Sequence, residues 1–239
     1  ASTTFLARLL PADVLADSAM SDGTSKLAWN NLAEPIATIT SFLAEREIAV
    51  NEPVILECVN SVPGALTVLA LLSAGTTFAL FPVPKPGSIE PQLPRFFRHR
   101  IRVRSSLGAK PNDVISLRDP ETFLDVHVID DHRPLPTYSS LRRERLLLRT
   151  SGSVEAPKMV VHTHSGLLAN ARNAIARLAL ERTDRVLIPV PLAHMYGLGA
   201  GFLPSLCAGA SIELLEGLGV AGDAAEFAEA ESKCGPHRH

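Results

Sequence analysis

Apolar and polar residues alternate in blocks along the chain, and these blocks predict strands and helices in turn. Residues 53–59 form a short β-branched and apolar run that indicates a buried strand. Residues 60–61 offer a helix N-cap, and Gly75 stands where the following helix should end. Residues 76–83 form a second apolar strand. Continuous apolar strands separated by a helix predict a parallel sheet that is covered on both faces.

The second half of the chain repeats this rhythm. Residues 146–149 predict a strand, a polar loop follows, and residues 158–161 fit a short further strand. Ser165 is the expected N-cap of a helix, and residues 185–190 and 210–215 predict two more strands. The apolar residues of that helix share one face: Leu168, Ala171, Ile175 and Leu178. The expected fold class is α/β, built from βαβ units with mainly parallel sheets flanked by helices.

The N-terminal residues and the overall composition limit the class of protein. Two helices are predicted at 5–17 and 32–46, with Trp29 between them. The net charge of −2 gives no reason to expect nucleic acid or an anionic membrane as a partner. The three cysteines lie far apart and indicate reduced thiols, and no signal peptide or apolar stretch of about 20 residues is visible. We therefore expect a cytoplasmic protein without a membrane span.

The most informative segment is a hydroxyl- and glycine-rich loop that ends in a lysine. Its polar residues Thr150, Ser151, Gly152 and Ser153 are followed by Lys158. Hydroxyls and backbone N–H groups can surround a polyphosphate, glycine lets the backbone approach it, and lysine supplies a compact positive charge. The loop does not fit the Walker pattern, because Pro157 replaces its second glycine and Met159 follows the lysine, so a GTPase or Walker-type ATPase is disfavoured.

A second motif follows about 30 residues later, with the sequence Pro-Leu-Ala-His-Met-Tyr-Gly-Leu at 191–198. Together the two motifs resemble those of the adenylate-forming superfamily, the AMP-dependent acyl- and aryl-CoA synthetases. The resemblance implies that Thr150, Ser151, Gly152, Ser153 and Lys158 hold the phosphates of ATP. It implies that His194, with Tyr196 and Gly197, borders the carboxylate pocket. Lys158 and His194 are the implied catalytic residues, and ATP or AMP with Mg²⁺ the implied cofactors.

Three residues of the loop depart from the family pattern. Val154 replaces a hydroxyl residue, and Met159 replaces a glycine that follows the lysine. Glu155 replaces another glycine and brings a negative charge to an anion site, which costs about 3 kcal/mol if two unit charges lie about 5 Å apart at an effective dielectric of about 20. These changes weaken the prediction of efficient ATP use.

Two other polar clusters have plainer interpretations. Arginines alternate in the segment 95–104, which fits either a patch for an acidic partner or the solvated face of an edge strand, and we favour the edge strand. The acidic partner would be CoA or a phosphopantetheine-bearing carrier protein. Cys234, His237 and His239 are too few and too close to the terminus for a metal site, so the metal ligands stay unknown.

The resemblance covers only the front part of the family pattern. We therefore expect residues 1–239 to be an incomplete N-terminal large domain, without the C-terminal lid domain. Its expected parts are a helical lead-in at 1–50, a first α/β unit with a proline- and arginine-rich connection at 51–145, the phosphate loop and acyl-pocket unit at 146–218, and a truncated or disordered tail at 219–239.

The function implied by the resemblance is that of an AMP-forming carboxylic acid ligase, of which this chain would be an N-terminal fragment that is inactive alone. Such a ligase converts a carboxylic acid and ATP to an acyl-adenylate and then transfers the acyl group to CoA or a carrier thiol. The alternatives are a non-catalytic homologue that acts as a binding or scaffold module, and an unrelated α/β nucleotide-binding domain. The acid, the acceptor and the oligomeric state cannot be read from these residues.

Overall fold

The computed structural model describes residues 4–48, 52–84, 87, 96–104, 115–129, 144–149 and 158–216. Within these residues the strands form two sheets. The six-stranded sheet has the order β6 (Leu124–Val128), β5 (His99–Val103), β3 (Val54–Cys58), β4 (Phe78–Pro82), β7 (Arg145–Arg149) and β8 (Met159–Thr163). The four-stranded sheet has the order β2 (Lys26–Ala28), β1 (Ala19–Ser21), β10 (Ser211–Leu214) and β9 (Arg185–Ile188).

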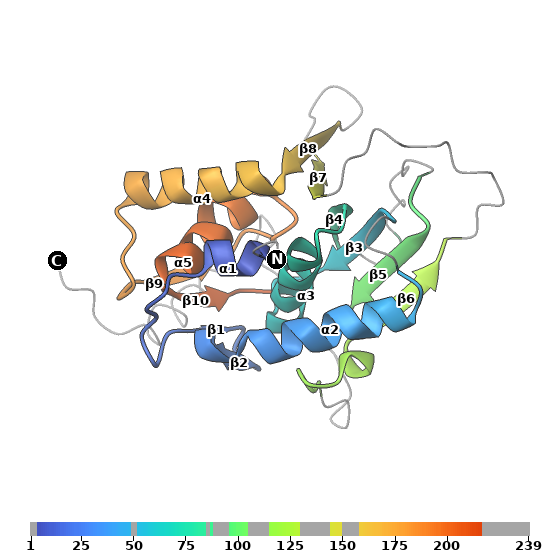
Figure 1. Ribbon diagram of the computed structural model, residues 1–239, viewed down its shortest axis with the longest axis horizontal. Helices are drawn as coiled ribbons and strands as arrows, with labels where there is room; N and C mark the ends of the chain where they lie inside the picture. The colour runs from blue at the N-terminus through green and yellow to red at the C-terminus, as the bar shows by residue number, and fades with distance from the viewer. Residues whose placement is uncertain are drawn as a thin grey trace.

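Helices lie between and around the two sheets (Figure 1). The α-helices are α1 (Phe5–Leu9), α2 (Ala33–Glu45), α3 (Val62–Ala74), α4 (His164–Leu178) and α5 (Leu203–Ala208). Two 3₁₀ turns, η1 (Trp29–Asn31) and η2 (Pro120–Thr122), and one π-helical segment, η3 (Tyr196–Phe202), complete the described elements. Figure 1 shows α1, α4 and α5 grouped near the four-stranded sheet, and α3 in the middle of the molecule.

The interior strands of both sheets are parallel, as the apolar runs predict. In the six-stranded sheet β3 is parallel to β4 and β5, and β4 is parallel to β7. The edge strands β6 and β8 are antiparallel to their neighbours. In the four-stranded sheet β10 is parallel to both β1 and β9. The predicted α/β class with mainly parallel sheets is therefore confirmed.

Helix α3 begins and ends at the residues that the sequence indicates. The side chain of Ser61 accepts a hydrogen bond from the Gly64 N–H at 3.1 Å, which makes Ser61 the N-cap. Gly75 ends the helix with φ of 72°, a left-handed conformation that glycine adopts without steric cost. Between these caps nearly every side chain is buried, since α3 is covered by the β-strands and by α1 and α2.

Several predicted boundaries at the helix ends are wrong. Helix α1 ends at Leu9 rather than at residue 17, because Pro11 cannot continue the hydrogen-bonding pattern. The N-cap of α4 is Thr163, whose hydroxyl accepts from the Gly166 N–H at 2.9 Å, so Ser165 lies within the helix. Leu178 is 57% exposed at the end of α4 and does not belong to the buried face.

The sheets also differ from the predicted division of the chain. Strands β1 and β2 lie in the segment that was expected to be a helical lead-in. Strand β1 pairs with β10, and β7 pairs with β4, so each sheet combines strands from distant parts of the sequence. The six-stranded sheet therefore combines strands of 51–145 with β8 of 146–218, whereas β9 and β10 of 146–218 pair in the four-stranded sheet. Nothing is described for most of the expected tail, because the described residues end at 216.

The arginine-rich segment is an interior strand, which corrects the prediction of an edge. Strand β5 lies between β3 and β6. Arg102 Nε lies 2.7 Å from Glu57 Oε2 on β3, and Arg100 Nε lies 3.5 Å from Glu57 Oε1. Arg104 donates to the carboxylate of Asp125 on β6. The alternating arginines therefore have acidic partners on the neighbouring strands.

Candidate active site

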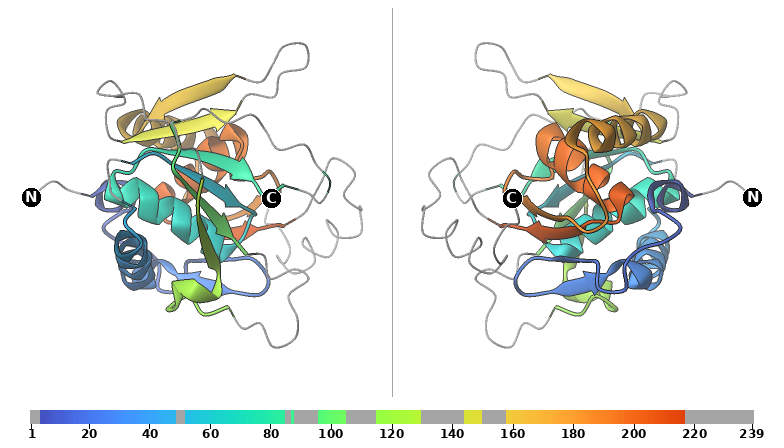
Figure 2. Two further views of the ribbon diagram at one scale, coloured as in Figure 1. Left: turned by 90° about the vertical axis from the view of Figure 1, so that its right-hand side faces the viewer. Right: turned by 90° about the vertical axis from the view of Figure 1, so that its left-hand side faces the viewer.

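The predicted phosphate loop connects two antiparallel strands. Arg149, the last residue of β7, is in register with Met159, the first residue of β8. Lys158 precedes Met159 and is exposed. Arg149 is exposed as well, so two cationic residues lie at the two ends of the loop. Figure 2 shows this β7–β8 pair on the α4 side of the molecule. The predicted phosphate residues Thr150, Ser151, Gly152 and Ser153 lie outside the described residues, as do Val154 and Glu155.

Helix α4 begins at the far end of β8, away from the loop. Strand β8 has five residues, which span roughly 17 Å at about 3.3 Å per residue. The N–H groups of the first turn of α4 therefore cannot reach an anion held at the loop. The cationic side chains described at the two ends of the loop are those of Arg149 and Lys158.

His164 is a buried residue of the core at the start of α4. It begins α4, is only 3% exposed and packs edge-on against the Phe5 ring, with 5.5 Å between ring centroids. Its backbone N–H donates to the Glu144 carbonyl at 3.2 Å. Burial and the nearby Arg145 charge lower the pKa of His164 to about 4. His164 is thus an uncharged packing residue at neutral pH.

The His194 motif forms the connection between β9 and η3. The His194 N–H donates to the Pro191 carbonyl at 2.9 Å, and the His194 carbonyl accepts from the Leu198 N–H at 2.9 Å. The His194 side chain is exposed, and Tyr196 is 74% exposed. These bonds fix the backbone of His194 in a compact turn while its imidazole stays accessible to a ligand.

Gly197 has a packing role below this turn. It is buried, and a Cβ atom added to it would lie 2.5 Å from the Val190 carbonyl oxygen and closer still to that of Pro191. Gly197 therefore lets two backbone segments approach each other. Tyr196 is exposed and Gly197 is buried, so only Tyr196 is accessible to a ligand from solvent. A π-helical segment begins here, and such segments are frequent at functional sites. Asn170 on α4 supports it by donating to the Gly199 carbonyl at 2.6 Å.

Asn60 joins the His194 motif to the six-stranded sheet. It follows β3, is 4% exposed, and donates from Nδ2 to the carbonyls of Ile188 at 3.1 Å and Val190 at 3.0 Å. Its Oδ1 accepts from the Leu192 N–H at 2.8 Å. The sequence identifies residues 60–61 as a helix cap but gives no signal of these contacts, since the partners lie about 130 residues away.

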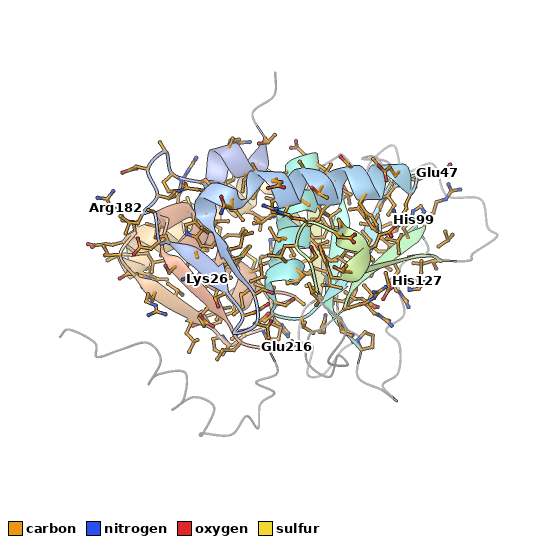
Figure 3. The ribbon with its side chains drawn as sticks, turned by 90° about the horizontal axis from the view of Figure 1, so that it is seen from below. Lys26, Glu47, His99, His127, Arg182 and Glu216 are labelled. Atoms are coloured by element: carbon orange, nitrogen blue, oxygen red, sulfur yellow. The ribbon has the colours of Figure 1, made fainter. Side chains whose placement is uncertain are left out.

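The carboxyl ends of the two sets of parallel strands face each other. Figure 3 shows Arg182, which precedes β9, at one end of the molecule and His99, which begins β5, toward the other. Glu216, just past β10, lies between them. The predicted loop follows β7, two strand spacings or about 10 Å from β3, and the His194 motif follows β9. Lys158 and His194 thus lie at the facing carboxyl edges, where α/β proteins bind ligands.

The described residues offer no separate metal centre. Among residues 4–48, 52–84, 87, 96–104, 115–129, 144–149 and 158–216, no three His, Cys, Asp or Glu side chains converge. Cys234, His237 and His239 fall outside these ranges. In the same part of the chain, no helix has the length and apolar character needed to cross a membrane.

Comparisons with known proteins identify the family. A family model described as AMP-binding enzyme matches residues 110–233, just over half of the chain. The chain therefore belongs to the AMP-binding enzyme family. It is 42% identical over 69 residues to an oxalate–CoA ligase of Arabidopsis thaliana, which covers 29% of this chain and 13% of that ligase. It is 32% identical over 139 residues to the acyl-CoA ligase sidI of Aspergillus fumigatus, which covers 50% of this chain and 24% of that ligase.

Solved structures show the same fold. ATP-bound MatB from Rhodopseudomonas palustris superposes with a TM-score of 0.65 at 16% identity, over 98% of this chain and 48% of that chain. Wild-type E. coli MenE, bound to an analogue of OSB-AMS, gives a TM-score of 0.55 at 21% identity, over 85% of this chain and 44% of that chain. The match thus spans less than half the length of each of these four relatives.

Proposed function

We propose that this chain supplies the phosphate-binding loop and part of the carboxylate pocket of an AMP-forming carboxylic acid ligase. The observation that carries the proposal is the arrangement of a loop with cations at both ends, Arg149 and Lys158, opposite the accessible His194. The family membership supports ATP as the nucleotide, and the relatives named CoA ligases support a carboxylic acid and CoA as the other substrates. A carrier-protein thiol is the alternative acceptor.

The proposed reaction has two steps. An oxygen of the substrate carboxylate attacks the α-phosphorus of ATP and forms an O–P bond, while the bond to the bridging oxygen breaks and pyrophosphate leaves. The thiol sulfur then attacks the acyl carbon, the bond to the AMP oxygen breaks, and the thiol proton passes to solvent. The products are a thioester and AMP.

Each residue of the site has a distinct task in this scheme. Lys158 and Arg149 offset the negative charge of the phosphates, and Thr150, Ser151, Gly152 and Ser153 donate hydrogen bonds to them. His194 borders the carboxylate and helps to orient it for in-line attack. Mg²⁺ would neutralise part of the charge of the triphosphate, since it is commonly bound through substrate phosphates.

The comparisons favour the ligase over a non-catalytic scaffold, because the cited relatives are named as CoA ligases, an acyl-CoA synthetase and a feruloyl-CoA synthase. The matches cover less than half the length of these relatives, so the 239 residues are not expected to supply every group that the whole reaction needs. Nucleotide binding is therefore the property to test on the 239-residue chain.

The test is calorimetric titration of the chain with ATP and magnesium. We expect saturable binding, and an increase in Kd of at least about tenfold in Lys158→Ala, which corresponds to the loss of one charge-assisted contact of about 1.4 kcal/mol. Lys26→Ala is the matched control, since Lys26 is an exposed lysine on β2 of the other sheet. A folded wild-type chain that does not bind ATP, or equal effects of the two substitutions, would overturn the proposal.

A further inference from the structure

The Asn60 side chain is fully engaged by one short stretch of backbone. Its amide group has two donor hydrogens, which bond the Ile188 and Val190 carbonyls, and an acceptor oxygen, which takes the Leu192 N–H. Only one orientation of the amide meets two carbonyls and one N–H, so the placement of Oδ1 and Nδ2 follows from the partners. All three partners precede His194 by two to six residues.

This stretch of backbone cannot be held by a strand ladder alone. Strand β9 ends at Ile188, and the next residues include Pro189 and Pro191, neither of which has an N–H to donate. Beyond Ile188 the backbone pairing of β9 with β10 stops. The Ile188 carbonyl also accepts from the Leu215 N–H at 3.1 Å, so Asn60 adds a second hydrogen bond there. Its bonds to the Val190 carbonyl and the Leu192 N–H hold backbone that lies past the end of the β9–β10 ladder.

The junction between β3 and α3, which carries Asn60, is itself held by hydrogen bonds. Two residues later, the Val62 N–H donates to Asp22 Oδ2 at 2.7 Å, and Asp22 follows β1. Asp22 Oδ1 in turn accepts from the backbone N–H groups of Thr24 at 3.0 Å and Ser25 at 2.6 Å. The junction between β3 and α3 is thus bonded to the carboxyl ends of both β1 and β9.

We propose that Asn60 is the positioning residue that sets the His194 motif in place against the sheet that carries the phosphate loop. It touches neither nucleotide nor acid, and it acts through the backbone of residues 188–192. That His194 is positioned to contact the carboxylate rests on the proposed function. That Asn60 holds the backbone of residues 188–192 rests on the hydrogen bonds alone. Replacing the Asn60 amide should therefore release the motif while leaving the β7–β8 pair unchanged.

The experiment measures hydrogen exchange by NMR in the 239-residue chain. In Asn60→Asp at pH 7, an ionised carboxylate faces two carbonyl oxygens in place of two donated hydrogen bonds. We expect the amides of Leu192, His194 and Leu198 to exchange at least about tenfold faster than in the wild type, after correction for intrinsic rates. Amides of β3 and β4 serve as the internal reference for global unfolding.

Rescue by protonation separates positioning from general destabilisation. A buried carboxyl group is readily protonated, and its O–H can then donate to one carbonyl. Lowering the pH from 7 to 5 should therefore restore part of the protection in Asn60→Asp. Titratable groups at this junction include Asp22, Cys58 and His194, so the wild type is measured at both pH values and its own change is subtracted.

Two further variants keep the test decisive. Thr67→Val removes another fully buried hydrogen bond, from Thr67 Oγ1 to the Pro63 carbonyl at 2.8 Å, which lies within α3 and not on the motif. Asn60→Ser retains a hydroxyl that can replace one of the lost hydrogen bonds. If Asn60→Asp does not fold, Asn60→Ser is measured in its place, and an increase of about threefold in the amide exchange rates of the motif is expected. Equal exchange at Leu192, His194 and Leu198 in the Asn60 and Thr67 variants would overturn the inference.

ATP affinity distinguishes this inference from the proposed function. The Kd for ATP should change less than about threefold in Asn60→Ser, because the phosphate loop connects β7 and β8, whereas Asn60 bonds the backbone of residues 188–192. Loss of ATP binding together with slow exchange at the motif would contradict the positioning role. Absence of ATP binding in the wild type would overturn the proposed function, and the exchange data would still decide the role of Asn60.

Discussion

The indole Nε1 of Trp29 donates a hydrogen bond to the carbonyl oxygen of Ala210 at 3.0 Å, and both residues are buried. Trp29 lies just after β2, and Ala210 immediately precedes β10. This one bond therefore joins the beginning of the chain to the last described strand. Both groups are shielded from water in the folded protein.

We predict that Trp29→Phe lowers the free energy of unfolding by about 1–3 kcal/mol, because the Ala210 carbonyl is left buried without this donor. The measurement is urea unfolding followed by circular dichroism, since Trp29 is the single tryptophan of the chain and its fluorescence is lost with it. A variant as stable as the wild type would mean that water or another donor reaches Ala210.

The buried carboxylate of Glu57 provides a second prediction. Glu57 has a 5% exposed side chain and lies between Arg100 and Arg102. Glu57→Gln keeps the size but removes the charge opposite two arginines that are themselves partly exposed, so a loss of about 1–3 kcal/mol in the free energy of unfolding is expected. Asp125→Asn is the matched control, because its pair with Arg104 is 34–49% exposed and is worth about 0–1 kcal/mol. Equal losses in the two variants would contradict the different burial of the two pairs.

Two glycines of η3 allow a third prediction with a built-in comparison. Gly197→Ala should destabilise the protein by about 1–3 kcal/mol, because the new Cβ would collide with the carbonyls below it. Gly201→Ala should be neutral or stabilising by up to about 1 kcal/mol, since its Cβ would meet Ile188 at an ordinary 3.5 Å and alanine favours helical backbone. Thermal unfolding of both variants measures the difference in stability, and a Gly201→Ala variant that is less stable than Gly197→Ala would refute the prediction.

The fourth prediction concerns pH and His164. The unfolded chain protonates this histidine near its ordinary pKa of 6.5, whereas the folded chain resists protonation until about pH 4. The unfolded state thus binds more protons between these values, and the free energy of unfolding falls as the pH falls through this window. The full effect is about 3 kcal/mol.

Urea midpoints at pH 7 and pH 4.5 measure this dependence. His164→Gln should flatten it. His162→Gln should flatten it less, because burial lowers the pKa of His162 as well but that side chain is only half-buried. The Asp125 carboxyl, whose pKa is lowered by its hydrogen bond with Arg104, titrates below this range and does not interfere. A wild-type midpoint that is constant from pH 7 to pH 4.5 would show that His164 protonates without cost in the folded state.

The sequence predicts the elements whose signals are local. Helix α3 has a cap, a left-handed glycine and continuous apolar residues, and all three act within the helix itself. Strands β1 and β2 have only three residues each, too few to show an alternating pattern, and β1 depends on β10 for its parallel partner. The interior place of β5 was missed for a similar reason, since the alternating arginines do not reveal that Glu57 lies opposite them.

The residues of the candidate site also fall into those that local sequence motifs identify and those that only the structure identifies. Lys158 and His194 are visible in the sequence because motifs of known spacing carry them, and the structure puts both at the carboxyl edges of their sheets. Their role in binding stays a prediction. Asn60 and Asn170 act through backbone carbonyls far away in sequence, so no pattern of neighbouring residues could have identified them.

The pairing of β1 with β10 has a consequence for the order in which the protein can fold during synthesis. Met20 lies beside Ile212, so the first strand of the chain must wait for about 190 further residues before its parallel partner exists. At about 5–20 residues per second, this interval is on the order of 10–40 s. The β3–β6 part of the other sheet is complete once residue 128 has been made. Four strands of the larger sheet are therefore available early, whereas β1 has only β2 beside it, and its other edge stays without a strand partner until β10 emerges.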